Sequence, residues 1–161
     1  CEYIKKNFKK DYVSLIPANL YGFGDKFDLK KSHVIPALVK KFHIAKIKNK
    51  KNVEVWGSGK SMREFLNVDD LAKAVLFCVK KKIKYNYINV GSSDYLSIKE
   101  LSILIKKIVE YEGQITFNTK FPDGTLKRKL DTRLFNKLGW KSQISLKKGL
   151  IAYYKEFKKK L

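Results

Sequence analysis

The chain has 161 residues, of which 44% are apolar and 32% charged, and its formal net charge is +21. This composition is typical of a folded globular chain and excludes a disordered one. No apolar run reaches the ~20 residues that a membrane helix needs. Cys1 and Cys78 have no metal-ligand spacing, which predicts no metal site and a reducing, cytoplasmic compartment.

The charge raises the possibility of a nucleic-acid-binding module, because basic surfaces neutralise phosphates. The excess is almost entirely lysine, however, and the arginines are Arg63, Arg128 and Arg133 only. Base-reading sites favour arginine forks, which lysine copies poorly. The pattern therefore favours helices with lysine-coated polar faces, and the nucleic-acid module is kept as a second alternative.

Apolar periodicity and turn residues predict elements in chain order. The first are the end of a helix, a buried strand that Pro17 stops, a loop, and a second helix: residues 1–8, 12–16, 22–32 and 33–46. Ser32 is expected to cap this second helix, with Pro36 in its first turn. Because residues 1–8 already resemble helix, we expect the chain to begin inside a longer protein.

The middle of the chain continues the alternation. Two extended segments, a helix and a buried strand are expected at residues 53–57, 63–68, 71–79 and 87–91. Asp69 or Asp70 would cap this helix, and one apolar face would carry Leu71, Val75, Cys78 and Val79.

A capping box at Ser97 and Glu100 opens the next expected helix, which runs to Tyr111 and is closed by Gly113. A strand over 114–118 and helices over 131–139 and 144–161, joined by a loop at Trp140, complete the chain. Strands that alternate with helices predict an α/β fold with some parallel strands.

Residues 57–61, Gly-Ser-Gly-Lys-Ser, resemble the end of a phosphate-binding P-loop. The full pattern requires a glycine where this sequence has Glu54. A P-loop also opens directly into a helix, whereas residues 61–68 are extended in pattern. The segment is therefore predicted to be a turn between two short strands, with Lys60 on the surface.

A longer motif surrounds this turn: Trp56-Gly57-x-Gly59-x-x-Met62-Arg63-Glu64-Phe65-x-x-Val68-Asp69-Asp70. It is similar to the signature of nucleotide-sugar enzymes in the extended short-chain dehydrogenase/reductase family. Further segments agree with this resemblance: PANLYG (17–22), SHVIPALVKKFHIAK (32–46), NVG (89–91), PDGT (122–125) and LGW (138–140).

Together these segments resemble the branch of the family that converts GDP-4-keto-6-deoxymannose to GDP-L-fucose with NADP(H). Its members combine 3,5-epimerisation with 4-keto reduction, and so are oxidoreductases with isomerase activity. The first alternative is another nucleotide-sugar epimerase, dehydratase or reductase of the same family.

The resemblance implies the end of a Rossmann-type NAD(P)-binding fold followed by a smaller α/β substrate-binding domain. Residues 1–22 would close the NADP-binding domain, and 23–161 would form mainly the GDP-sugar domain, with about 60–92 returning to the former. The resemblance implies that the family's Gly-rich turn, catalytic Ser and Tyr-x-x-x-Lys pair belong to an amino-terminal half outside this sequence, since neither Tyr3 nor Tyr12 begins such a pair. We therefore expect a carboxyl-terminal part of an enzyme that is inactive in hydride transfer alone and homodimeric when complete.

For catalysis and cofactor binding, the resemblance implies that His33 donates a proton in the epimerisation and also contacts NADP. Reprotonation of a carbon beside a ketone suits a histidine, since its pKa lies near neutrality. The nicotinamide end of NADP would meet Pro17, Ala18, Asn19 and Leu20. The ordinary alternatives are a loop histidine at 33 and a plain strand-ending turn at 17–20.

For the substrate, the resemblance implies contacts from Lys41, Trp56, Arg63 and Asp123. Arg63 has the planar fork that grips a diphosphate, whereas Lys41 stands where the family usually has arginine. Asp123 would accept hydrogen bonds from a ribose or a guanine amino group. The ordinary alternatives are core packing for Trp56 and a simple Pro-Asp-Gly turn for Asp123.

Overall fold

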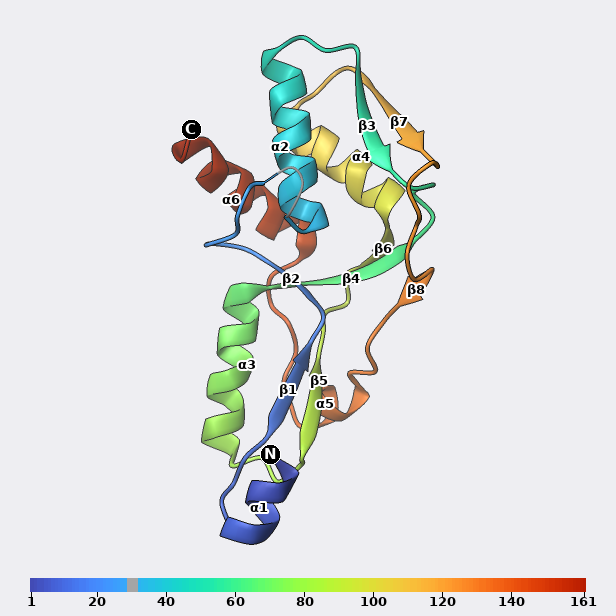
Figure 1. The fold of residues 1–161 in the computed structure, drawn as a ribbon. Helices are drawn as coiled ribbons and strands as arrows, with labels where there is room; N and C mark the ends of the chain where they lie inside the picture. The colour runs from blue at the N-terminus through green and yellow to red at the C-terminus, as the bar shows by residue number, and fades with distance from the viewer. Residues whose placement is uncertain (29–31) are drawn as a thin grey trace.

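The computed structural model describes residues 1–28 and 32–161 (Figure 1). Residues 29–31 of the predicted 22–32 loop lie outside the described residues. The helices are α1 (Glu2–Phe8), α2 (Val34–Ile47), α3 (Val68–Lys81), α4 (Ile98–Val109), α5 (Arg133–Lys137) and α6 (Leu146–Lys159). The strands are β1 (Ser14–Pro17), β2 (Asn19–Tyr21), β3 (Asn52–Trp56), β4 (Met62–Asn67), β5 (Tyr87–Val90), β6 (Tyr95–Ser97), β7 (Gln114–Asn118) and β8 (Lys127–Arg128).

The strand pairings confirm an α/β fold with parallel strands. β1 pairs in parallel with β5, and β3 pairs in parallel with β7. β4 is the hub of a third sheet, since it pairs in parallel with β2 and β8 and antiparallel with β6. In Figure 1 β4 crosses the middle of the elongated molecule, with α2, α4 and α6 on one side of it and β1, β5 and α3 on the other.

Each of these two halves has its own hydrophobic core. The first core is centred on α2, α4 and α6, where Phe42, Leu101 and Leu150 are almost fully buried. The second core lies around β1, β5 and α5, and includes Ile88 and Phe135. Burial of each such side chain contributes roughly 1.5–3 kcal/mol to the free energy of unfolding. Each half is therefore stabilised by its own core.

The helix starts show where local sequence signals succeed and fail. The capping box at Ser97 and Glu100 is confirmed, since both of its hydrogen bonds form. The cap expected at Asp69 or Asp70 is wrong, because the side chain of Asn67 caps α3 by accepting from the Asp69 amide. The Ser32 cap is also wrong: His33 occupies the N-cap of α2 without a side-chain bond.

Ser32 is engaged in the preceding loop, where its hydroxyl donates to the Asp28 carbonyl. The expected end of α4 at Gly113 is wrong too. The helix ends at Val109, and its C-cap residue Glu110 takes the left-handed conformation with φ of 58°. At Gly113 an added Cβ would lie 2.0 Å from the Tyr111 hydroxyl, so the glycine serves packing and not capping.

The strand end predicted at Pro17 is confirmed, but the chain does not enter a loop there. Pro17 is the last residue of β1, and after Ala18 the chain continues directly as β2 in the next sheet. The short strands β6 and β8 were not expected, because each has three residues or fewer and exists only through its pairing with β4.

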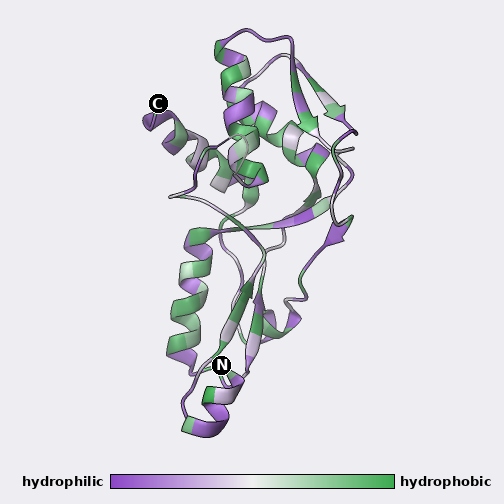
Figure 2. Cartoon of the chain, in the orientation of Figure 1, coloured by the Kyte–Doolittle hydropathy of each residue, from purple (hydrophilic) through white to green (hydrophobic). Residues whose placement is uncertain are grey.

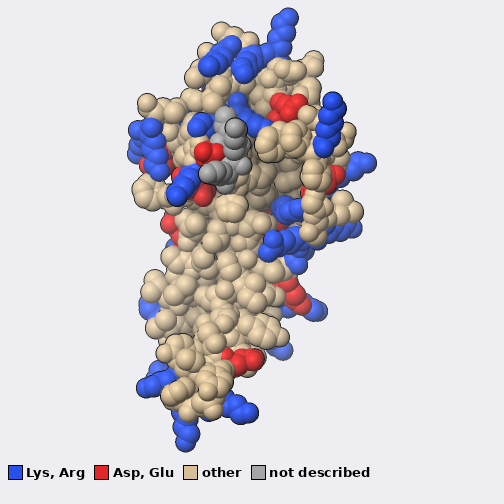
Figure 3. Space-filling view, in the orientation of Figure 1, with Lys and Arg blue, Asp and Glu red and all other residues tan. Residues whose placement is uncertain are grey.

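The predicted apolar face of α3 is only partly buried. Cys78 is 4% exposed, but Val75 and Val79 are 45% and 71% exposed. Figure 2 shows most of α3 as apolar, and Figure 3 shows few charged atoms over α3 and β1. This half of the molecule therefore presents an uncovered apolar surface. Within the described residues no helix combines the length and apolarity needed to cross a membrane.

Glu64 is a carboxylate in the interior, only 1% exposed, on β4. Its Oε1 accepts from the Ser92 amide at 2.7 Å and its Oε2 from the Leu130 amide at 2.9 Å. An added Cβ at Gly91 would lie 2.1 Å from Oε1, so only glycine allows this approach. One side chain thus joins the centre of the molecule to two distant segments.

We predict that Glu64→Ala destabilises the chain by about 2–4 kcal/mol, because two buried amides lose their acceptor. The free energy of unfolding is measured by urea titration followed by circular dichroism. Glu112→Ala, at an exposed carboxylate, is the control and should change stability by less than about 0.5 kcal/mol. Equal effects of the two substitutions would contradict the role given to Glu64.

Candidate functional site

A pocket of about 320 Å³ is lined by residues of α2 and of the strands β2, β3 and β4. Its wall includes predicted site residues from five separate places in the chain: Asn19, Lys41, Trp56, Arg63 and Asp123. Apolar side chains such as Leu38 and Phe65 complete the lining. The fold therefore brings most of the predicted site residues into one concave surface.

The Gly-Ser-Gly-Lys-Ser turn lies in the chain between the pocket residues Trp56 and Arg63 and binds the carboxylate of a third pocket residue, Asp123. The Ser58 amide and hydroxyl donate to the two carboxylate oxygens of Asp123, each at 2.6 Å, and the Ser61 hydroxyl donates to the Asp123 carbonyl at 2.8 Å. Gly57 has φ of 84°, and a Cβ there would lie 2.4 Å from Asp123 Oδ1. The predicted turn between strands is confirmed, and Lys60 is exposed.

Asp123 is therefore ordered by Ser58 before any ligand arrives. The Ser58 hydroxyl, and next its amide, hold the pKa of the Asp123 carboxyl below its ordinary value. A carboxylate has about four acceptor positions, so the two bonds from Ser58 leave some of them for a ligand. The residue both fastens the turn and faces the pocket.

Two backbone carbonyl groups fix the side chain of Arg63 at the wall of the pocket. Its Nη1 donates to the Met62 carbonyl at 2.8 Å and to the Thr125 carbonyl at 2.6 Å. Its Nη2 and Nε make no hydrogen bond within residues 1–28 and 32–161. A guanidinium that is held by one nitrogen and open at the others is arranged to bind an anionic group.

Trp56 is half exposed and does not belong to either core. Its ring stacks on Phe121 with centroids 4.5 Å apart and planes at 16°. Lys41 Nζ lies 4.6 Å from the centroid of the same indole and donates to the Glu54 carbonyl at 3.1 Å. Burial lowers the pKa of Lys41, and the charge of Glu54 opposes this shift.

Phe121 was missed by sequence reasoning, although an aromatic residue beside the Pro-Asp-Gly turn was a usable signal. Its stacking on Trp56 depends on the two turns meeting. Adjacency of these turns follows from the parallel pairing of β3 with β7, which the sequence pattern does not specify.

Of the residues assigned to catalysis and cofactor binding, most do not line the pocket. His33 is exposed and its neighbours Ser32 and Val34 line the pocket. In the 17–20 segment only Asn19 reaches the pocket, and its side-chain amide donates to the Glu64 carbonyl at 2.8 Å. Pro17 ends β1, Ala18 donates its amide to the Val90 carbonyl, and Leu20 packs on the second core.

Asn19 Oδ1 makes no hydrogen bond among the described residues, so it is available to a donor such as a carboxamide. The same part of the chain, residues 1–28 and 32–161, contains no cluster of three His, Cys, Asp or Glu side chains arranged to hold a metal.

Comparison with known proteins places this geometry in a family. The NAD dependent epimerase/dehydratase family model matches residues 1–91. The chain belongs to this family. Membership confirms the resemblance to nucleotide-sugar enzymes drawn from the Trp56–Asp70 motif, and the family's description as NAD dependent indicates a nicotinamide cofactor.

This family member resembles both curated proteins and solved structures. "Probable GDP-L-fucose synthase 1" of Oryza sativa subsp. japonica is 43% identical over 145 residues, covering 90% of this chain and 44% of that protein. A GDP-6-OMe-4-keto-L-xylo-heptose reductase from C. jejuni is 34% identical, with a TM-score of 0.92 over 100% of this chain and 57% of that chain.

A GDP-L-fucose synthetase from Naegleria fowleri bound to NADP is 27% identical, with a TM-score of 0.86 over 98% of this chain and 50% of that chain. The epimerase/dehydratase chain thus spans about half the length of the curated relatives it matches. These solved structures confirm its Rossmann-type α/β fold.

We predict that Ser58→Ala raises the pKa of Asp123 toward the ordinary value, because the hydroxyl is the main cause of its depression. In the parent chain the stabilisation from this contact is complete above the ordinary pKa of 3.8. It is lost as the pH falls through the lower pKa of the folded chain. NMR titration of the Asp123 side-chain carboxyl measures the shift. Ser93→Ala is the exposed control, and an equal shift there would contradict the assignment.

Proposed function

We propose that this chain is the carboxyl-terminal part of an NADPH-dependent GDP-L-fucose synthase, which converts GDP-4-keto-6-deoxymannose to GDP-L-fucose. The observation that supports it is the convergence of Asn19, Lys41, Trp56, Arg63 and Asp123 on one pocket. The relatives at about 40% identity, which are named as GDP-L-fucose synthases, support the same substrate.

On the substrate side, Arg63 is the diphosphate ligand of this proposal. Its two backbone anchors fix the guanidinium, so little side-chain entropy is lost when an anion binds. Lys41 supplies a second positive charge beside Trp56. The Trp56–Phe121 stack offers a flat apolar edge to the nucleotide, and Asp123 uses its remaining lone pairs for a ribose or guanine donor.

For the epimerisation, His33 is the proton donor. The carbons beside a 4-keto group are acidified by it, and inversion requires one group to remove a proton and another to return it to the opposite face. His33 is the N-cap of α2, and within the described residues its ring makes no capping hydrogen bond. It stands next to Ser32 and Val34 on the pocket wall.

NADP(H) is the cofactor of this proposal, and it would supply the hydride for the 4-keto reduction. The residues present fit its nicotinamide end. The 17–20 segment follows the carboxyl end of the parallel pair β1–β5, where open α/β sheets bind ligands. Asn19 adds a free amide oxygen that can accept from a carboxamide.

The domain division is part of the same proposal. The second core, with β1, β5 and α3, would belong to the NADP-binding domain, and the first core to the substrate domain. Residues of about 60–92 include both α3 and β5, which agrees with their expected return to the former. The exposed apolar residues of α3 give that domain a surface on which further structure can pack. A homodimer and a cytoplasmic location stay predictions.

A C4 reductase of another GDP-sugar is the second candidate, and the similarity to the C. jejuni heptose reductase favours it. A reductase alone needs no proton donor for inversion. A catalytic role for His33 would therefore distinguish the epimerase/reductase from the simple reductase. The nucleic-acid module has less support, because Arg63 faces the sugar pocket and Arg133 is paired with Asp131 at 2.6 Å.

We predict that His33→Gln in the complete protein slows proton exchange at the carbons beside the ketone by about 10²–10⁴-fold, the usual worth of general acid–base catalysis. Deuterium uptake from D2O into GDP-4-keto-6-deoxymannose, followed by NMR, measures it. His43→Gln is the control and should leave the exchange unchanged. Unimpaired exchange in His33→Gln would remove the epimerase role and favour a simple reductase.

We predict that Arg63→Lys weakens GDP binding by about 10–100-fold, since lysine keeps the charge but loses the fork. Isothermal titration calorimetry with GDP gives the Kd. Arg133→Lys, at an exposed ion pair on the surface, is the matched control and should change the Kd by less than about twofold. Equal losses would show that net charge, and not the pocket, binds the nucleotide.

A further inference from the structure

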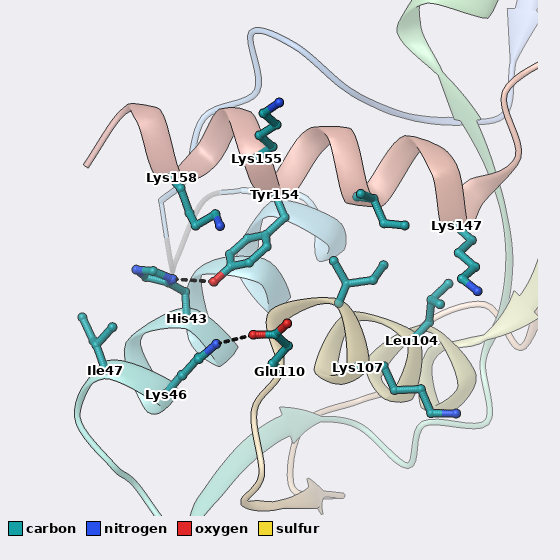
Figure 4. Close-up of a pocket in the computed structure, with 12 residues that line it drawn as sticks. His43, Lys46, Ile47, Leu104, Lys107, Glu110, Lys147, Tyr154, Lys155 and Lys158 are labelled. Carbon is teal, nitrogen blue, oxygen red and sulfur yellow. Dashed lines mark hydrogen bonds and ion pairs between the residues drawn. The ribbon is translucent and has the colours of Figure 1, made fainter.

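An open groove of about 860 Å³ lies between α2, α4 and α6 (Figure 4). α2 gives Lys41 to the candidate functional site and His43, Lys46 and Ile47 to this groove. The two openings therefore share the helices α2 and α4 but no lining residue, and the groove has no part in the proposed function. We call it the lysine groove.

The floor of the lysine groove is aliphatic. Ile47 and Ile151 are 63% and 51% exposed, and Leu104 and Ile108 are only partly buried against the first core. Aliphatic groups in a concave surface gain roughly 25 cal/mol for each Å² that a partner covers. The floor is thus a place where an apolar surface would be stabilised.

The rim of the groove is cationic. Lys46 is neutralised by Glu110 at 3.0 Å, but four other lysines face the groove: Lys107, Lys147, Lys155 and Lys158. None of these four makes an ion pair in the described part of the chain. Burial, and then the charges of Lys46 and Lys158, lower the pKa of His43. A complementary partner must carry negative charge.

The charges and the floor run along the helices and are not gathered at a point. On α6 the groove residues Lys147, Ile151, Lys155 and Lys158 share one face at helical spacing. They extend over about 16 Å at the rise of an α-helix. Leu104, Lys107 and Ile108 repeat the pattern on α4. An elongated ligand fits this arrangement better than a single phosphate does.

We propose that the lysine groove binds an acidic amphipathic helix of a partner protein. Its aliphatic side chains would cover the isoleucine floor, and its carboxylates would meet the unpaired lysines on both rims. This is the helix-in-groove mode of recognition, in which anchors recur every three or four residues.

Two other occupants fit less well. A second copy of this chain, docked through a two-fold axis, would bring lysine rim against lysine rim. Nucleic acid would use arginine forks or open aromatic faces. None of the three arginines lines the groove, and Tyr154 is hydrogen-bonded to His43 at 2.9 Å with Lys158 Nζ 5.1 Å from its ring centroid.

The probe is a fluorescein-labelled helical peptide of about 18 residues, long enough to lie along α6. It has leucines on one face and glutamates on the other, and a control peptide of equal composition has its leucines scattered. Anisotropy titrations of the full chain at about 0.15 M salt give both Kd values. We expect the amphipathic peptide to bind at least about tenfold more tightly than the control.

Variants locate the binding. Ile151→Ser, and the pair Lys155→Glu with Lys158→Glu, should each weaken the amphipathic peptide about tenfold. The pair Lys6→Glu with Lys81→Glu makes the same charge change on exposed lysines of α1 and α3, and should have less than about a threefold effect. All altered side chains are exposed, and circular dichroism monitors folding.

If the unaltered chain bound the two peptides with equal affinity, the proposal would be overturned without any variant. Binding would then depend only on the net charge of the peptide and not on its amphipathic pattern. Equal losses in the groove pair and the control pair would also overturn it. Duplex DNA that binds more tightly than the peptide, loses affinity in the groove pair and ignores Ile151→Ser would assign the groove to nucleic acid instead.

Discussion

The carboxylate of Glu64 is the interaction on which the arrangement of this chain depends. It sits inside the molecule on β4 and accepts amide hydrogens from Ser92 and Leu130. Two further acids of the same region act alike: Asp70 accepts from the Gln143 and Ile144 amides, and Asp94 from the Leu146 amide at the start of α6. Buried carboxylates are costly unless so paired, which makes each contact specific. The segment between the two cores is thereby fixed from several points.

The candidate site is likewise assembled by hydrogen bonds between segments that are far apart in the sequence. Residues 121–125 belong to the chain between β7 and β8, and they are fastened to the glycine turn through Ser58 and Ser61. Arg63 adds a bond to the Thr125 carbonyl from the neighbouring strand. These contacts place a guanidinium and an aromatic pair on one wall before a ligand binds. Preorganisation of this kind lowers the entropic cost of binding a flexible diphosphate.

The lysine content has two meanings within this fold. Over most of the surface the lysines form the solvent-exposed polar faces of helices, as the sequence pattern indicates. In the lysine groove, however, lysines without an ion pair among the described residues surround aliphatic side chains that stay exposed or only partly buried. Composition alone could not separate these cases, because the distinction depends on which faces of α2, α4 and α6 meet. α2 carries both this surface and Lys41, and so connects two otherwise separate parts of the molecule.

Short stretches of the sequence specify three features of this protein. The hydrophobic period specifies the fold class, local hydrogen bonds specify the capping box at Ser97, and the long motif specifies the family. The sequence also excluded a P-loop at Gly57–Ser61 by spacing alone. The tertiary structure decided what long-range contacts control: that Asn67 and not Asp70 caps α3, that Asp70 turns inward, and that Phe121 stacks on Trp56. It also decided that Ser58 binds Asp123. Such contacts join residues dozens of positions apart, and local propensity carries no information about them.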